Sequence, residues 1–211
     1  MIRDAGMAAA ANTLVIACGA LAREFVALRE ANGWSHIDVS CLPAELHNRP
    51  EKIPGLVREK IHRFKTQYPH IFVAYADCGT GGLLDTVLQE EGVQRLPGAH
   101  CYEFYAGSAA FAQMAEAELG TFYLTDFLLR HFERLIMHGL GIDKHPQLLP
   151  VYFGNYTTLM YLCQKESPEG IALGQAAANR LGLAFAYRVT GYGEMETELK
   201  TVSERVIQWR N

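Results

Sequence analysis

Cysteine, histidine and glutamate residues of this sequence gather just after short apolar segments, and side chains of these types suit metal or thiol chemistry. Cys101 stands in the stretch PGAHCYEFYAG, directly after His100 and two residues before Glu103. Cys18 and Cys78 each follow an apolar segment and precede a glycine, in ACGAL and DCGTGG. Thiolate, imidazole and carboxylate groups all bind zinc, and three of them with an open fourth position make a Lewis-acid or thiol-activating site.

The expected metal ligands are Cys18, Cys78 and Cys101, with His47 or His100 as a fourth ligand or as a group beside the ligands. The spacing contains neither CxxC nor HxxxH, so the site depends on the fold to bring these residues together. Zinc is the expected metal. Iron, including an iron–sulfur cluster held by three cysteines, is the alternative, since the same ligands suit it.

Two of the cysteines stand in glycine turns that lead into predicted helices. Glycine lets the backbone turn sharply, and the N–H groups at a helix start stabilise an anion such as a thiolate or a bound ligand. Cys18, Cys78 and Glu103 are the candidate catalytic residues. The candidate cofactor-binding positions are the glycines of the two turns, Gly19, Gly79, Gly81 and Gly82. Neither turn is a P-loop or a dinucleotide fingerprint, so no nucleotide cofactor is predicted.

Short apolar runs alternate with longer helical patterns along the chain, which predicts an α/β fold. We expect an open, mostly parallel sheet with helices on both faces and a helix-rich C-terminal half. The predicted strands are 13–17, 36–40, 71–76 and 184–190, and TFYLT is a strand or a helix connection. The predicted helices are 20–32, 54–68, 83–91, 108–118, 126–140, 156–163 and 169–181. Because the carboxyl ends of parallel strands share one edge, this fold would bring the separated cysteines together.

The composition indicates a protein with one sizeable core and reduced thiols. The chain has 211 residues, of which 49% are apolar, and we expect a flexible N-terminus over 1–12 and a single α/β domain over 13–211. The net charge of -4 gives no reason to expect a nucleic-acid or anionic-membrane partner. No export signal or membrane span is visible, so we expect a cytoplasmic protein. The odd count of five cysteines also argues against a disulfide framework.

Several segments together resemble one family of bacterial and archaeal proteins, domain-of-unknown-function family 1638. They are ACGAL, LPAELHNRPEKI, YADCGTGG, HCYEFYAG, GTFYLTDF and YFGNY, and the resemblance spans roughly 13–192. The family's hallmarks match Cys18, His47 with Pro50, and Cys78. Many members carry Arg-x-His-Asp-Cys, whereas this chain has PGAHC, so Cys101 keeps its match while His100 falls at the aspartate position.

The resemblance implies a role near corrinoid-dependent methyltransferase components, since genes of this family lie close to them. The chain lacks the Asp-x-His-x-x-Gly segment of cobalamin ligation, so corrinoid binding by that means is not expected. Metal-bound thiolates suit methyl transfer, because the metal lowers a thiol's pKa. The leading hypothesis is a metal-thiolate protein of one-carbon or corrinoid-linked methyl-group metabolism with a small-molecule substrate.

Other interpretations stay open. Cysteine is among the most buried residue types, and packing is the favoured interpretation for Cys41 and Cys163. Cys18 and Cys78 can instead form a metal-free acid/base pair, by analogy with aspartate/glutamate racemases. A third interpretation is a non-catalytic carrier of metal or cofactor for a methyltransferase. The apolar stretch TFYLTDFLLRHFERLIMHGLG is a buried central helix or a homodimer interface.

Overall fold

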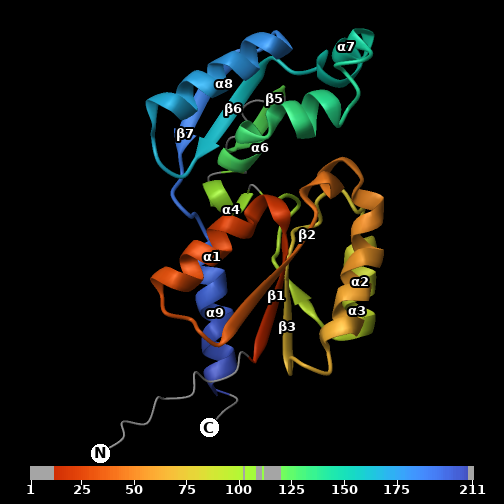
Figure 1. Cartoon of the computed structure of the whole chain (residues 1–211), viewed down its shortest axis with the longest axis vertical. Helices are drawn as coiled ribbons and strands as arrows, with labels where there is room; N and C mark the ends of the chain where they lie inside the picture. Colours follow the sequence, from red (N-terminus) through yellow and green to blue (C-terminus); the bar gives the residue numbers. More distant parts are fainter. Residues whose placement is uncertain (1–11, 102, 108–110, 112–119, 209–211) are drawn as a thin grey trace, which may run out of the picture.

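The first of two parallel sheets is built around a strand whose residues are all buried (Figure 1). This strand, β1 (Thr13–Cys18), is an uninterrupted apolar run after Thr13, which is typical of a parallel strand covered by helices on both faces. The strand order is β2-β1-β3-β4, and all neighbours are parallel. The other strands are β2 (Ile37–Leu42), β3 (His70–Ala74) and β4 (Gln94–Arg95). The computed structural model describes residues 12–101, 103–107, 111 and 120–208.

Helices cover both faces of this sheet, with α1 and α9 on one side and α2 and α3 on the other (Figure 1). The α-helices are α1 (Ala22–Ala31), α2 (Ile53–Phe64), α3 (Leu83–Glu91) and α9 (Met195–Gln208). The 3-10 turns at the strand ends are η1 (Gly19–Leu21), η2 (Ala44–Asn48) and η3 (Pro50–Lys52). The last helix, α9, lies against the first sheet, so the C-terminal segment returns to the lobe in which the described chain begins (Figure 1).

A second parallel sheet, with the order β5-β6-β7, forms the other lobe. Its strands are β5 (Thr121–Thr125), β6 (Thr158–Cys163) and β7 (Ala184–Val189). Its helical segments are α6 (Asp126–Arg130), the π-helical η4 (Glu133–His138), η5 (Pro146–Leu148), α7 (Leu149–Phe153) and α8 (Pro168–Leu181). The predicted α/β class with parallel strands and surrounding helices is confirmed.

The strands are divided between two sheets, whereas a single sheet was expected. The strand β4 spans only two residues and forms one edge of the first sheet. The chain instead passes through α4 (Glu103–Ala106) and begins the second sheet with β5. The stretch TFYLT is therefore a strand.

The helix predicted over 156–163 is wrong, because this segment contains β6. The sequence TLMYLC is the central strand of the second sheet, and its last three residues are buried. A short apolar run that is buried on both faces has no alternation to distinguish it from a helix. The predicted helix over 126–140 is present as α6 followed by η4, and Leu135, Ile136 and Met137 are buried. The helix predicted over 108–118 lies outside the described residues except for residue 111.

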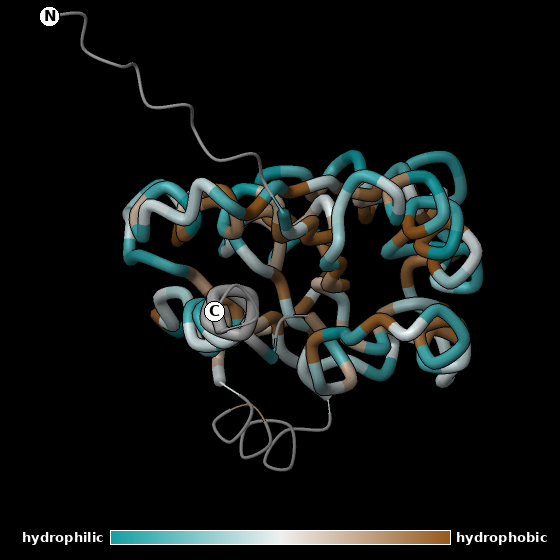
Figure 2. Tube along the Cα trace, turned by 90° about the horizontal axis from the view of Figure 1, so that it is seen from below, coloured by the Kyte–Doolittle hydropathy of each residue, from teal (hydrophilic) through white to brown (hydrophobic). Residues whose placement is uncertain are grey.

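The carboxyl ends of both sheets face one another where the two lobes meet (Figure 1). Buried residues of both lobes form one contiguous core cluster, and apolar stretches of the chain lie toward the interior in Figure 2. The single domain over 13–211 stays a prediction, and residues 1–11 lie outside the described part. Among the described helices, none has the length and apolar character needed to cross a membrane.

The close approach of Gly19 to the chain that follows β2 generates a stability prediction. A Cβ at Gly19 would lie 2.7 Å from the carbonyl oxygen of Leu42 and 3.0 Å from the amide nitrogen of Ala44. Both neighbours are backbone atoms that cannot rotate away, so Gly19→Ala should lower the free energy of unfolding by about 1–3 kcal/mol in urea denaturation.

Gly55→Ala is the matched control, because a Cβ there meets no atom within 4 Å and Gly55 lies within α2. This change should raise the free energy of unfolding by about 0.5–1 kcal/mol, since alanine favours helix more than glycine does. Equal stability of the two variants would contradict the proposed packing.

Candidate functional site

The predicted site residues lie at the carboxyl edge of the first sheet, on the segments that follow its four strands. Cys18 is the last residue of β1, His47 lies in η2 after β2, Cys78 follows β3, and Cys101 follows β4. Because all four strands are parallel, these segments end at one edge, which faces the second lobe (Figure 1). The fold therefore brings together residues from four separate parts of the chain.

Cys78 and Cys101 are in direct contact, with 2.8 Å between their sulfur atoms. Backbone hydrogen bonds between the two loops place them. The amide of Cys78 donates to the carbonyl of Ala99 at 2.8 Å, and the amide of Asp77 donates to the carbonyl of Gly98 at 3.1 Å. Cys101 is buried, whereas Cys78 is partly exposed. The pair therefore has an inner and an outer thiol.

The pKa values of the two thiols shift in opposite directions. A hydrogen bond from Cys101 lowers the pKa of Cys78, and burial of Cys78 opposes this effect. The same hydrogen bond, followed by burial, raises the pKa of Cys101. The pKa of the outer thiol is thus lowered and that of the inner thiol is raised.

Cys18 and Tyr75 lie on the buried side of this pair. Burial raises the pKa of Cys18 to about 12. Burial also raises the pKa of Tyr75, and the charges of Cys18 and Cys101 add to this effect. The Tyr75 hydroxyl approaches Cys18 but has no well-formed hydrogen bond within the described part of the chain. A buried hydroxyl thus lies among Cys18, Cys78 and Cys101.

The sequence analysis did not single out Tyr75. Its signal was a tyrosine near the end of the apolar run IFVAYA, two residues before the aspartate of the DCG turn. A tyrosine buried to 1% exposure at such a position needs a polar partner, which makes it a candidate for the site.

The loop that carries Cys78 is held by the carboxylate of Asp77. The Thr80 hydroxyl donates to it at 2.6 Å, the Gly82 amide at 2.9 Å and the Gly81 amide at 3.2 Å. Cys78 has a φ of 50°, the only positive φ at a non-glycine residue in the described part. The amides of Gly81 and Gly82 were expected to stabilise an anion, and the anion that they bind here is Asp77.

His47 and His100 lie close enough to influence one another. Burial lowers the pKa of His47, and the charge of His100 lowers it further. The segment that carries His47 packs onto the second glycine turn, since a Cβ at Gly79 would lie 3.5 Å from the ring of Pro50. The predicted hallmarks Cys78 and His47 with Pro50 therefore belong to one packed edge.

The carboxylate of Glu103 is hydrogen-bonded to the backbone of its own loop. One oxygen of its carboxylate accepts hydrogen bonds from the amides of Ala99 at 3.1 Å and His100 at 3.0 Å. These bonds hold the loop just before Cys101. The structure therefore places Glu103 as a support for the loop, and a catalytic role for it stays a prediction.

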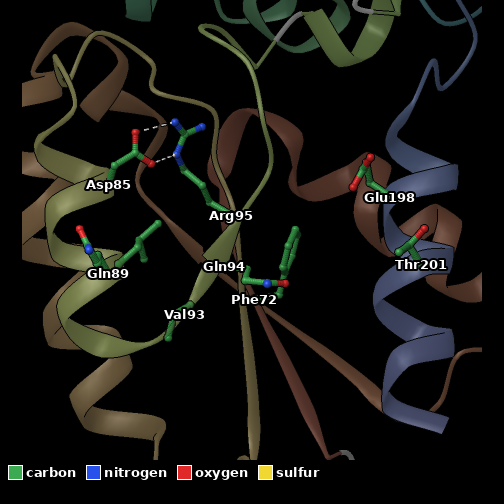
Figure 3. A pocket seen from close by; sticks show the side chains of 9 residues that line it. Phe72, Asp85, Gln89, Val93, Gln94, Arg95, Glu198 and Thr201 are labelled. Carbon is green, nitrogen blue, oxygen red and sulfur yellow. Dashed lines mark hydrogen bonds and ion pairs between the residues drawn. The ribbon is translucent and has the colours of Figure 1, made fainter. Parts of the chain in front are cut away.

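A cavity of about 510 Å³ lies between β4 and α9 and is separate from the thiols (Figure 3). Arg95 on its wall forms two ion-paired contacts with Asp85, at 2.6 and 2.8 Å, and also donates to the carbonyl of Leu96 at 2.6 Å. None of the cysteines lines this cavity. Arg95 thus ties α3 to the loop that leads to Cys101.

The thiol and imidazole groups at this edge suit a soft metal, but they do not lie close enough together to hold one in the present conformation. In the described ranges, no group of three His, Cys, Asp or Glu side chains is spaced to hold a metal ion. Cys78 and Cys101 are adjacent, whereas Cys18 is coupled to Cys78 only through its charge. Cys41 on β2 and Cys163 on β6 lie on strands and not in the glycine turns.

Comparison with known proteins gives one match. A family model described as "Protein of unknown function (DUF1638)" matches residues 41–199, which include Cys78, Cys101 and His47. No curated protein and no solved structure matches the chain.

The bonds of Asp77 generate a prediction for the site. Asp77→Ala should lower the free energy of unfolding by about 1–2 kcal/mol, because two loop amides and one hydroxyl lose their acceptor. The same change should speed the alkylation of Cys78, since its loop is no longer held. Urea denaturation and timed labelling with a maleimide measure the two effects.

Asp77→Asn is the control, because it keeps one oxygen acceptor at the same place and should have a smaller effect on both measurements. An Asp77→Ala variant that unfolds and labels like the unchanged protein would show that these bonds do not hold the loop.

Proposed function

Because the chain belongs to the DUF1638 family, whose description assigns no activity, we propose its function from the thiol site itself. The protein binds a soft transition-metal ion, zinc first and iron as the alternative, through Cys78 and Cys101. It uses this site on a small thiol, amine or methylated substrate. The observation that carries the proposal is the contact of two thiols at 2.8 Å next to a third buried thiol.

The distance between the two sulfurs allows a test of the fit. Tetrahedral zinc with zinc–sulfur bonds of about 2.3 Å holds two sulfurs about 3.8 Å apart. The observed 2.8 Å means that the two sulfurs must separate by about 1 Å to share the ion. A rotation of the partly exposed Cys78 side chain supplies such a displacement, because its loop lies at the surface.

The third ligand of the proposal is Cys18, and the Tyr75 hydroxyl lies beside it. A thiol buried this deeply would otherwise stay protonated at neutral pH. A bound divalent ion removes that penalty by compensating the charge of the thiolate, and it presents the thiolates to an electrophilic group. His47 and His100 stand close to one another at the same edge and are the candidates for the remaining ligand position.

The wider setting of this function rests on the family resemblance. We propose a cytoplasmic protein of one-carbon metabolism with a corrinoid methyltransferase system as its partner. The odd count of five cysteines agrees with a reducing compartment. A carrier that delivers the metal to a methyltransferase would use the same ligands, but it would show no turnover alone.

The metal-free acid/base pair of Cys18 and Cys78 is less favoured by the geometry. The thiol that contacts Cys78 is Cys101, and Cys18 is buried to 4% exposure with its pKa raised to about 12. A proton-abstracting base works best with a pKa near the operating pH and with access to the substrate. Cys18 meets neither requirement.

Elemental analysis of protein purified without a metal-chelating tag tests the proposal. We expect close to one zinc or iron per chain, and loss of the metal from the Cys78→Ser and Cys101→Ser variants. Zinc affinity should fall by more than the roughly 10–100-fold that loss of an outer supporting group costs. Cys18→Ser should weaken binding as well.

Cys163→Ser is the matched control, because Cys163 lies on β6 of the second sheet, where its thiol donates to the carbonyl of Arg188 at 3.5 Å, so this variant should keep the metal. Metal-free protein of unchanged fold, or equal metal content in the Cys78→Ser and Cys163→Ser variants, would overturn the proposal.

A further inference from the structure

We propose that Cys78 and Cys101 are a redox-active dithiol that reduces small disulfides, with Cys78 as the attacking thiol and Cys101 as the resolving thiol. This activity uses two of the thiols of the proposed metal site, but it does not depend on metal binding. The inference rests on the distance between the two sulfurs, on the difference in their exposure, and on the rigid backbone that holds them.

The distance between the two sulfurs is short enough for a disulfide bond to form after a small movement. A disulfide bond is about 2.05 Å long, so the two sulfurs at 2.8 Å need to approach by less than about 1 Å to form one. Two sulfurs that only pack against one another would stand farther apart than this. The chain therefore holds these thiols where a small rotation of one side chain is enough to join them.

The difference in exposure determines the order of attack. Cys101 is exposed to 6%, so a disulfide from solvent cannot reach it. Cys78 is partly exposed and is followed by the exposed Gly79, so Cys78 is the residue of the pair that a small molecule can approach. An outer attacking thiol with an inner partner in contact is the arrangement that resolves a mixed disulfide within the same molecule.

The backbone on both sides of the pair is held by hydrogen bonds. Asp77 and Cys78 donate to the loop before Cys101, and the Asp77 carboxylate accepts from the turn after Cys78. Glu103 holds the amides of Ala99 and His100. With both loops fixed, little conformational freedom is lost when the sulfurs join, so the second step competes well with the reverse reaction.

The reaction balances as a two-electron exchange. The Cys78 thiolate attacks one sulfur of a small disulfide RSSR, which forms a Cys78–SR mixed disulfide and releases RS⁻. Cys101 then loses its proton to solvent and attacks the Cys78 sulfur, which forms the Cys78–Cys101 disulfide and releases the second RS⁻. Both thiolates take up protons, so the protein dithiol is oxidised and one disulfide becomes two thiols. A dithiol reductant returns the protein to its reduced form.

The experiment treats the reduced full-length protein with a small excess of hydroxyethyl disulfide, with and without a metal chelator, followed by peptide mass mapping. We expect a Cys78–Cys101 disulfide and two released small thiols per chain. Cys101→Ser should stop at a stable mixed disulfide on Cys78 with one thiol released. Cys78→Ser should leave Cys101 unmodified.

Cys41 supplies an internal control, because it is also partly exposed but has no second thiol in contact with it. Any adduct on Cys41 should persist, whereas the adduct on Cys78 should be resolved. Timed alkylation of the unsubstituted protein covers the case in which a variant fails to fold. In that measurement Cys78 should react at least about 10-fold faster than Cys101, since only exposed thiolates react.

Three results would overturn the inference: modification of Cys101 before Cys78, persistent adducts on both Cys78 and Cys41, or no linked peptide in the chelated protein. The metal proposal fails independently of these. Protein that is purified without any bound metal and still forms the disulfide contradicts the proposed metal site alone. Protein that binds zinc, yet forms no disulfide after chelation, contradicts the dithiol alone.

Discussion

The hydrogen bonds between the loop after β3 and the loop after β4 are the interaction on which the site depends. Two backbone amides, those of Asp77 and Cys78, donate to the carbonyls of Gly98 and Ala99. These bonds continue the pairing of β3 with β4 beyond the end of the strands. Because of them, residues that are 23 positions apart place their sulfurs 2.8 Å from one another.

Hydrogen bonds to two carboxylates and close backbone packing help to hold the loops in place. The carboxylates of Asp77 and Glu103 each accept from loop amides, one on either side of the thiol pair. Gly19 and Gly79 allow the segment after β2 to pack onto the two glycine turns. The amides that might have bound an external anion are therefore used to hold the loop, and the thiols remain as its reactive groups.

Metal binding and disulfide formation make different demands on the same pair of sulfurs. The first requires the sulfurs to separate by about 1 Å, and the second requires them to approach by somewhat less. Cys101 is fixed in the interior, so Cys78 is the side chain that must move in both cases. Oxidation of the pair and occupation by a metal would therefore exclude one another, which links the two proposals physically.

The sequence alone determined the α/β class, the parallel direction of the strands and the position of the cysteines at strand ends. These features follow from local patterns, because an apolar run bounded by glycine and followed by a helical period has few other folds available. The family was also recognisable from short segments such as DCGTGG and LPAELHNRP, and the family match over 41–199 confirms it.

Only the tertiary structure decided which thiols meet. Sequence reasoning named Cys18, Cys78 and Cys101 together as metal ligands and paired Cys18 with Cys78 in the metal-free alternative, whereas the fold joins Cys78 to Cys101 and leaves Cys18 behind them with Tyr75. It also divided the strands between two sheets and made 158–163 a strand instead of a helix. In each case the deciding contacts are hydrogen bonds between segments far apart in the chain. Such contacts leave no periodic signal in the sequence, so they became visible only once the chain was folded.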